Sequence, residues 1–466
     1  MDRLECDVAI IGAGTAGLAA ERSARRKGAK TLLIDERFAG TTCATVGCMP
    51  SKLLIAAANA THEAKKLSEF GIEAVEPRVN GKAIMSRLRR LRDDFVSSVL
   101  KSIEDIPEDI RIKGKARFTA ADRLDVDGRE IVARAIVIAT GSSVAIPAPF
   151  EALGDRVLTN ETIFELEDLP KSLAVIGAGP LGLELAQAMA RLGVHVEVFD
   201  KSEGLPVSKD ETVAMAMKAI LSAEFPLHLG VDVTPERRGN HVRLSWQGTS
   251  SDTRDFERVL VAIGRPPRVD HLGLEETGLD CDDHGVPVFD KRTLQCGKSR
   301  IFMAGDANSE RPLLHEASFE GAVAGRNAAD ADNPAERGRM VPFAITFTDP
   351  PVADIGAQTD DGIVGEASYE NQGRARVEAT NKGLVRLFAR QDGTLTGAAL
   401  AAPAGDHLAH LLAWSIERGA TASELLDMPF YHPTYEEGLQ GALREICKAT
   451  DRELPDAYDI GTSPGA

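Results

Sequence analysis

The chain has 466 residues, 43% of them hydrophobic and 27% charged, which is the profile of a folded globular protein with about three domains. Lys and Arg number 54 against 71 Asp and Glu, so the formal charge is −17. An acidic surface repels phosphate backbones and anionic lipid heads, which makes nucleic acid and membranes poor partners. No apolar run approaches the roughly 18 residues of a spanning helix, and the first residues read as a strand rather than a cationic leader. We therefore expect a cytoplasmic protein.

An internal repeat dominates the first half of the chain. Residues 8–35 and 173–200 share their landmarks at a constant offset of 165, and each reads as strand, glycine turn, helix and strand. In such a turn the first glycine bends the chain, the second admits a pyrophosphate, and the third packs the helix on the strand. An acid that ends the second strand suits a ribose diol. The repeat therefore predicts two dinucleotide sites, formed by Gly12, Gly14, Gly17 and Asp35 and by Gly177, Gly179, Gly182 and Asp200.

Three further segments have the pattern of buried parallel strands that end in a glycine turn. They are residues 135–143 with ATGSS, residues 258–267 with IGRPP, and residues 299–307, where Asp306 follows the strand. Any one such segment is common by itself, so the presence of all three in this order is stronger evidence for a nucleotide-binding fold than any single segment.

The pattern changes after about residue 338. Alternating runs predict strands, and two stretches with helical periodicity predict amphipathic helices. This indicates a separate α+β domain with a polar end. The strands are predicted at 341–347, 383–390 and 394–402, and the helices at 407–419 and 434–448.

Cys43 and Cys48 lie close together, directly after the first nucleotide motif. A bridge between them would close so short a loop that it would stabilise the fold by only about 2 kcal/mol, which favours a redox role. A helix N-terminus or a cation such as Lys52 lowers a thiol pKa, as thiol exchange requires. Two cysteines alone do not make a zinc site, and His407 and His410 lack a third partner, so we expect no metal.

These motifs together resemble the pyridine-nucleotide disulfide oxidoreductases, the flavoenzyme family of dihydrolipoyl dehydrogenase, glutathione reductase and mercuric reductase. The resemblance spans nearly the whole chain and is carried by IGAGTAG, CATVGCMPSK, ATGSS, IGAGPLGLE, VAIGRPP, FMAGDA and the final HPTYEE. It implies an α/β fold with two Rossmann-like three-layer domains, for FAD and NAD, and a C-terminal α+β dimerisation domain. The implied boundaries are 1–147 and 272–338 for a discontinuous FAD domain, 148–271 for the NAD domain, and 339–466 for the interface domain with its polar tail.

The resemblance also implies roles for single residues. Cys48 would face the flavin and Cys43 would exchange with the substrate. A histidine titrates near neutral pH and a carboxylate can fix its tautomer, so His432 with Glu437 suits proton transfer to and from a thiol. The resemblance places this pair in the partner subunit's site, which implies a homodimer.

The remaining implied residues contact the cofactors. The first glycine set and Asp35 would bind the ADP half of FAD, and the second set and Asp200 would bind NAD(H). Asp306 would contact the flavin side of FAD. The other implied site residues are Lys52, which would lie near the flavin and pair with Glu184, and Thr140, Gly141 and Gly264 in the strand-end turns.

The sequence favours NAD(H) over NADP(H), because Asp200 would repel a 2′-phosphate and Lys201 is the only cation in the stretch that follows. Pro180 stands where glutathione reductase-like enzymes tend to place a tyrosine, and the C-terminal cysteine pair of mercuric reductase is missing. The favoured activity is therefore oxidation of dihydrolipoamide by NAD+, as in dihydrolipoyl dehydrogenase. The substrate would be a small-molecule or lipoyl-domain dithiol, and a 2-oxo acid dehydrogenase complex is a candidate partner.

Two alternatives stay open. One is an NAD(P)H-dependent reductase of another disulfide or a quinone, since nothing in the sequence describes the disulfide pocket. The other is a non-catalytic flavin-binding redox sensor.

The chain also departs from its relatives, with Thr41 for a glycine, Ala44-Thr45 for Val-Asn, and Pro351 for a glutamate.

Overall fold

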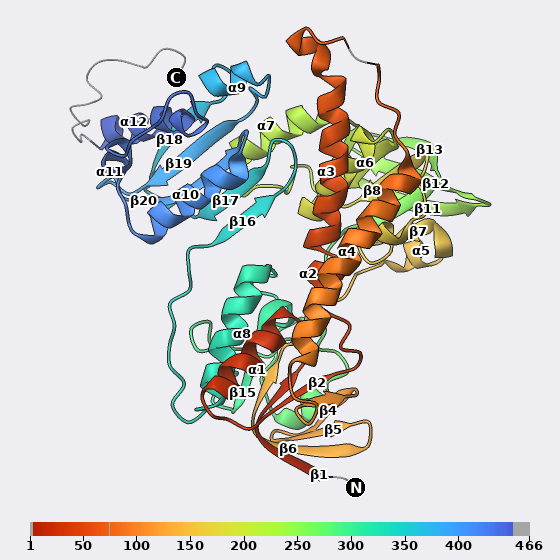
Figure 1. Ribbon diagram of the computed structural model, residues 1–466, viewed down its shortest axis with the longest axis vertical. Helices are drawn as coiled ribbons and strands as arrows, with labels where there is room; N and C mark the ends of the chain where they lie inside the picture. The colour runs from red at the N-terminus through yellow and green to blue at the C-terminus, as the bar shows by residue number, and fades with distance from the viewer. Residues whose placement is uncertain (1–2, 74, 451–466) are drawn as a thin grey trace. The chain divides into compact units, whose positions relative to one another are not determined.

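The computed structural model describes residues 3–73 and 75–450 (Figure 1). The chain forms two compact units, and the predicted three-domain boundaries stay a prediction. In their described residues, the first unit comprises Met1–Leu53, Ser86–Ala145 and Gly264–Arg339, and the second comprises Leu54–Met85, Ile146–Ile263 and Met340–Ala466.

The first unit is built on a seven-stranded sheet in which the first copy of the repeat forms the expected strand, helix and strand. These are β1 (Arg3–Ile11), α1 (Thr15–Arg26) and β2 (Thr31–Asp35). β6 (Arg129–Ile138) runs parallel to β1, and β15 (Ile301–Met303) runs parallel to β6. The glycine turn and two of the predicted strand ends therefore meet at one edge of the sheet. The order is β3-β2-β1-β6-β5-β4, completed by β3 (Arg111–Lys113), β4 (Ala116–Ala120) and β5 (Arg123–Val126).

Helices α1 and α8 (Leu314–Ala328) cover one face of this sheet and lie side by side (Figure 1). The contact is close because α8 has glycines on the α1 side. A Cβ at Gly321 or Gly325 would come within 2.1 Å of an α1 carbonyl oxygen, that of Ala16 or Ala20. The central strands are apolar along their length because both faces of the sheet are covered.

In the second unit, the second copy of the repeat also forms as predicted, with β8 (Ser172–Ile176), α6 (Pro180–Arg191) and β9 (His195–Asp200). The sheet has the order β10-β9-β8-β14-β7, and β14 (Arg258–Val261) runs parallel to β8. An antiparallel sheet that the sequence analysis did not predict packs against it through Trp246 and Phe256. Its strands are β11 (Val231–Arg238), β12 (His241–Gly248) and β13 (Asp252–Phe256), and the other elements are β7 (Val157–Leu158), α7 (Glu211–Ser222) and β10 (Leu227–Leu229).

The final part of the second unit is α+β, as expected, with an antiparallel sheet in the order β16-β17-β20-β19-β18. The helix predicted at 434–448 begins later, because residues 436–438 form a 3-10 turn and α12 starts at Leu439. Most of the predicted polar tail lies outside the described residues. The elements are β16 (Phe343–Thr346), β17 (Val352–Gly356), β18 (Ile363–Ser368), α9 (Gly373–Val377), β19 (Leu384–Ala389), β20 (Leu395–Ala401), α10 (Gly405–Glu417), α11 (Ala422–Leu426) and α12 (Leu439–Ala449).

Two long helices were absent from the sequence predictions. They are α3 (Cys48–Lys65) and α4 (Gly81–Glu104), and each contributes residues to both units. Across 3–73 and 75–450, no helix is long and apolar enough to cross a membrane.

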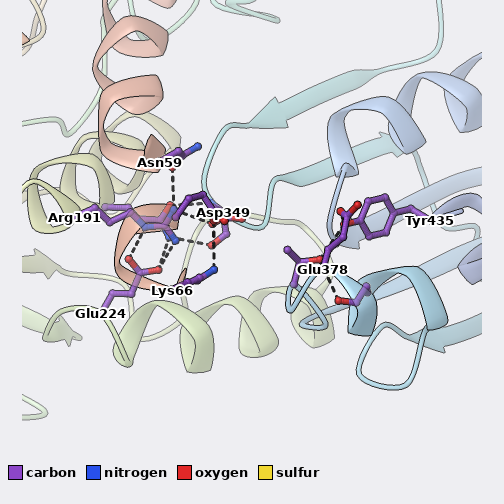
Figure 2. A network of polar contacts seen from close by, with 11 residues as sticks. Asn59, Lys66, Arg191, Glu224, Asp349, Glu378 and Tyr435 are labelled. Carbon is purple, nitrogen blue, oxygen red and sulfur yellow. Dashed lines mark hydrogen bonds and ion pairs between the residues drawn. The ribbon is translucent and has the colours of Figure 1, made fainter. Parts of the chain in front are cut away.

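A polar cluster around the buried Arg191 joins α3, α6 and the segment before β17 within the second unit (Figure 2). The Arg191 side chain is only 4% exposed. Its Nε and Nη2 each donate to a Glu224 carboxylate oxygen at 2.8 Å, and its Nη1 donates to Asp349 Oδ2 at 2.8 Å and Asn59 Oδ1 at 2.9 Å. Gln187 exchanges two hydrogen bonds with the Asp349 backbone, at 2.8 and 3.0 Å. The cluster therefore holds the segment between β16 and β17, which contains Asp349, against α6.

Candidate active site

The two glycine turns have the geometry that the repeat predicts. Gly12 has a φ of +103°, and a Cβ there would lie 2.3 Å from the Ala139 carbonyl oxygen. At Gly17 a Cβ would lie 1.8 Å from the Gly12 carbonyl oxygen, so only glycine lets the helix approach the turn. Gly177, with a φ of +106°, and Gly182 repeat this arrangement in the second unit.

The second glycine of each turn is different, because its space is open. A Cβ at Gly14 or Gly179 would meet no protein atom within 4 Å, yet both residues precede a helix and provide no side-chain cap. An open approach to uncapped N–H groups at the positive end of a helix suits a pyrophosphate. The residues present therefore fit a dinucleotide at both turns.

The two predicted ribose acids also hold their turns in the same way. Asp35 Oδ2 accepts a hydrogen bond from Ala13 N at 2.9 Å, and Asp200 Oδ2 accepts one from Ala178 N at 2.7 Å. Lys201, the cation that follows Asp200, forms a 2.9 Å ion pair with Asp232. Both side chains of this pair are more than 80% exposed, so it is a weak surface contact.

In the first unit, residues from three predicted strand ends meet around Asp306. Ser142 Oγ donates to Asp306 Oδ2 at 2.8 Å. Arg265 in turn donates to Ser142, from Nε to Oγ at 3.1 Å and from Nη2 to the carbonyl oxygen at 3.0 Å. The hydroxyl of Thr140 is buried and has no hydrogen-bond partner, so it is suited to bond a ligand at this edge.

Asp306, Thr140, Gly141 and Gly264 were predicted site residues, whereas Ser142 and Arg265 were not. Both stand inside the quoted motifs ATGSS and IGRPP, so the signal was their position in a glycine turn at a strand end. The turns also bond through their backbones: Arg268 N donates to the Gly141 carbonyl at 2.8 Å.

Cys43 lies in the short helix α2 (Thr42–Thr45), and Cys48 is the first residue of α3. Both are thiols in the structure. A hydrogen bond with the Cys48 thiol, followed by burial, raises the pKa of Cys43 well above its usual value, whereas the charge of Lys52 lowers it. The two thiols are therefore in contact, and the prediction of a lowered pKa is wrong for Cys43 in this dithiol state. The hydroxyl of Thr45, between the cysteines, is buried and has no hydrogen-bond partner.

His432 and Glu437 form a local pair in the loop before α12. The Nδ1 of His432 lies 3.0 and 3.2 Å from the two carboxylate oxygens of Glu437, which is buried, while the histidine side chain is 53% exposed. Glu437 also accepts a bond from Thr434 N at 2.9 Å. Because Nδ1 faces the carboxylate, the Nε2 atom is left to exchange protons with a ligand.

Buried side chains from the segment between β18 and α9 fix this loop. Gln372 Nε2 donates to the Thr434 carbonyl at 2.6 Å, and the hydroxyl of the fully buried Tyr369 donates to the Tyr435 carbonyl at 3.0 Å. The Tyr435 hydroxyl bonds Glu378, as Figure 2 shows. Tyr369, Gln372 and Glu378 lie outside the quoted motifs and were not predicted, whereas Tyr435 stands inside HPTYEE.

Glu184 and Lys52, predicted to pair, belong to different units, so their pairing stays a prediction. Glu184 is buried in α6 and accepts a hydrogen bond from Phe347 N at 2.8 Å. His410 packs against Phe343 and Trp414, whereas His407 is exposed. In the part of the chain that is described, no group of three His, Cys, Asp or Glu side chains is placed to hold a metal ion.

Comparison with known proteins gives two family matches. Residues 6–321 match the pyridine nucleotide-disulphide oxidoreductase model, and residues 342–443 match its dimerisation domain. A dihydrolipoyl dehydrogenase of Bacillus subtilis is 31% identical, covering 94% of this chain and 97% of the relative. The corresponding enzyme of Haloferax volcanii is 30% identical, covering 94% and 95%. A mercuric reductase of Acidithiobacillus ferrooxidans is 31% identical, covering 96% and 84%.

Solved structures agree on the fold. LpdA from Mycobacterium tuberculosis superposes with a TM-score of 0.81 at 22% identity, covering 95% of this chain and 99% of that one. The HOCl-induced flavoprotein disulfide reductase RclA from Escherichia coli gives 0.80 at 22% identity, covering 94% and 99%. The predicted α/β architecture, with Rossmann-like sheets and a C-terminal dimerisation domain, is confirmed. The chain therefore belongs to the pyridine nucleotide-disulphide oxidoreductase family.

Proposed function

We propose that this member of the family is an FAD-dependent dithiol oxidoreductase that oxidises dihydrolipoamide with NAD+. The observation that carries the proposal is the contact between the Cys43 and Cys48 thiols at the start of α3, with Lys52 one turn further on. A reversible bond between two such thiols, positioned at a helix N-terminus, is suited to disulfide exchange.

The cofactor sites follow from the two glycine turns. The turn at Gly14, with Asp35 and the Asp306 edge, would hold FAD, and the turn at Gly179, with Asp200, would hold the nicotinamide nucleotide. Family members use these two cofactors, and the open space at both turns fits them. FAD held at the first turn would supply two-electron chemistry between the Cys43–Cys48 dithiol and NAD+.

The protein's own residues carry out the thiol chemistry. His432 of one subunit would accept a proton at Nε2 from a dihydrolipoyl thiol, with Glu437 holding Nδ1–H. The resulting thiolate attacks the sulfur of Cys43 in the Cys43–Cys48 disulfide, so that a mixed disulfide forms and Cys48 leaves as a thiolate. The second substrate thiol then attacks the mixed disulfide and displaces Cys43, which releases cyclic lipoamide. The two protons of the substrate thiols pass by way of His432 to the Cys43 and Cys48 thiolates and complete the enzyme dithiol.

The match to the family's dimerisation domain indicates a homodimer, and the mechanism needs one if His432 serves the partner's cysteines. A lipoyl domain of a 2-oxo acid dehydrogenase complex is the larger substrate that fits this chemistry. NAD+ is preferred over NADP+ because Asp200 would oppose a 2′-phosphate and Lys201 is the only cation in the stretch that follows.

A second candidate is a reductase that uses NADH to reduce another disulfide or acceptor. One observation favours it: a mercuric reductase is as similar to this chain as the dihydrolipoyl dehydrogenases are. A non-catalytic redox sensor is disfavoured, because a chain with that role has no need for both a thiol pair and a histidine–glutamate pair.

The test is dihydrolipoamide-dependent reduction of NAD+ by the purified holoenzyme, with NADP+ beside it. We expect turnover with NAD+, and we expect Cys48→Ser to lower kcat more than about a thousandfold while FAD is retained. Cys281→Ser is the matched control, because Cys281 is exposed and lies outside the motif. If NADH reduces the flavin but lipoamide shows no turnover in either direction, the substrate assignment fails and the second candidate takes its place.

A further inference from the structure

A buried carboxylate lies under the turn that carries Asp306 in the first unit. Glu320, in α8, has no exposed surface. Its Oε2 accepts a hydrogen bond from Gly305 N at 2.8 Å and another from Asn308 Nδ2 at 2.7 Å. Its Oε1 forms an ion pair with Arg339. One carboxylate therefore holds both ends of the four-residue turn η5 (Gly305–Asn308), which contains Asp306.

A charged group in this position is unfavourable unless its partners compensate for the loss of water. Burial raises the pKa of Glu320 above its usual value, and Arg339 and the two turn donors oppose that shift without cancelling it. An apolar residue would fill the same volume without this cost. The bonds to the turn are what the carboxylate provides and an apolar side chain does not.

The turn has little room to find other partners. Gly305 has a φ of +71°, and a Cβ there would lie 2.8 Å from the Ala16 side chain, so the turn is pressed against α1. Gly305 and Asn308 are both buried, so their N–H groups would be left without acceptors if Glu320 were lost. From the other side, Ser142 holds the Asp306 carboxylate itself.

We propose that Glu320 is a positioning residue of the flavin site, which holds the Gly305–Asn308 turn so that Asp306 keeps its orientation toward FAD. The inference rests on the proposed function in one respect, namely that Asp306 contacts FAD. Glu320 acts through the turn and does not itself touch the cofactor.

The helix offers a matched control. Glu316 lies one turn earlier on α8 and is only 1% exposed. It forms ion pairs with Arg311 at 2.8 Å and with Arg339 at 3.1 Å. Glu316 and Glu320 are thus both buried, lie on the same helix and both pair with Arg339. The turn, however, donates its hydrogen bonds to Glu320.

The experiment compares Glu320→Leu with Glu316→Leu. Release of FAD from each purified holoenzyme on dilution is followed by flavin fluorescence, and the visible spectrum of the bound flavin is recorded. We expect Glu320→Leu to weaken FAD binding at least tenfold and to shift the spectrum. Glu316→Leu should change FAD affinity less than threefold and leave the spectrum unchanged, even where both variants melt earlier. Equal losses of FAD in the two variants, or full FAD affinity in Glu320→Leu, would overturn the proposal.

Two milder substitutions keep the test decisive if Glu320→Leu does not fold. Glu320→Gln retains an acceptor oxygen for the turn but not the charge opposite Arg339, so FAD affinity and spectrum should stay near wild type. Asn308→Ala removes one of the two turn bonds and should give an intermediate loss. A larger loss in Glu320→Gln than in Asn308→Ala would mean that the charge matters rather than the turn bonds, which contradicts the proposal.

Asp306→Ala separates this inference from the proposed function. If the wild-type protein binds no FAD, or if Asp306→Ala binds it normally, the proposed flavin site itself fails. If the wild type binds FAD, Asp306→Ala loses it and the Glu320 variants bind it normally, only the role of Glu320 fails.

Discussion

Replacing Arg191 with methionine tests the polar cluster around this residue in the second unit. The substitution keeps the aliphatic stem but removes the donors that serve Glu224, Asp349 and Asn59 (Figure 2). Breaking a buried ion pair from one side costs about 3–5 kcal/mol. The Glu224 side chain is 18% exposed and Asp349 is 38% exposed, so water screens part of the interaction. We therefore expect a loss of about 2–3 kcal/mol.

Because the protein has several domains, amide hydrogen exchange measures this loss better than a global melt. The amides of Phe347 and Asp349 bond the side chains of Glu184 and Gln187, so they report on local opening. A loss of 2–3 kcal/mol corresponds to roughly 30- to 150-fold faster exchange, at about 1.4 kcal/mol for each factor of ten. Peptide-level mass spectrometry at neutral pH measures it.

The control is Arg243→Met, which breaks an equally well-formed pair with Asp255 at 2.8 and 3.0 Å whose side chains are more than 40% exposed. It should leave exchange in residues 347–349 unchanged. Less than threefold acceleration in Arg191→Met, or equal acceleration in both variants, would show that Arg191 does not hold this segment.

The effect should also depend on pH. Burial opposes ionisation of Glu224, but the bonds from Arg191 and Gln187 outweigh it and lower its pKa below the usual value. A carboxyl group whose folded pKa is depressed stabilises the protein above its unfolded pKa of about 4.3, and this contribution is lost as pH falls through the folded value. The difference between wild type and Arg191→Met should therefore be full at pH 6–7 and shrink below about pH 4.

Two further comparisons test the cofactor turn and the histidine loop. Gly14→Ala should fold, since its Cβ meets no protein atom, but it should lose most bound FAD because the methyl group takes the space of the pyrophosphate. Gly12→Ala should instead disrupt the turn itself, and circular dichroism and flavin content distinguish the two variants. Normal flavin content in Gly14→Ala would contradict the assignment of this turn to FAD. Tyr369→Phe removes a hydrogen bond to the backbone of the loop that carries His432, so it should lower kcat with dihydrolipoamide several-fold and leave NADH-dependent flavin reduction unchanged. The Tyr435 hydroxyl bonds side chains, so Tyr435→Phe should lower kcat less. A larger loss in Tyr435→Phe would argue against positioning of the loop by Tyr369.

The features that depend on short stretches of chain could be predicted from the sequence. The glycine turns were predictable because their constraints, a positive φ at Gly12 and close approach of the helix at Gly17, are local to one strand-turn-helix unit. The spacing of Cys43 and Cys48 and the pairing of His432 with Glu437 are local for the same reason. The periodic strands and helices of the C-terminal domain also follow from short-range patterns, although a 3-10 turn at Glu436–Gly438 precedes the last helix, which starts at Leu439.

Which distant residues share a site depends on how the elements pack together, and this could not be predicted from the sequence. Asp306, Ser142 and Arg265 are far apart in the chain. They meet in the first unit because the parallel strands β6 and β15 bring Ser142 and Asp306 to one edge of the sheet, where Arg265 bonds Ser142. Glu320 reads as an ordinary helical glutamate, and only the packing of α8 under the Asp306 turn makes it buried and bonded. Arg191 likewise looks like the basic end of a helix. Burial and partnership of charged side chains depend on long-range packing, which no local pattern encodes.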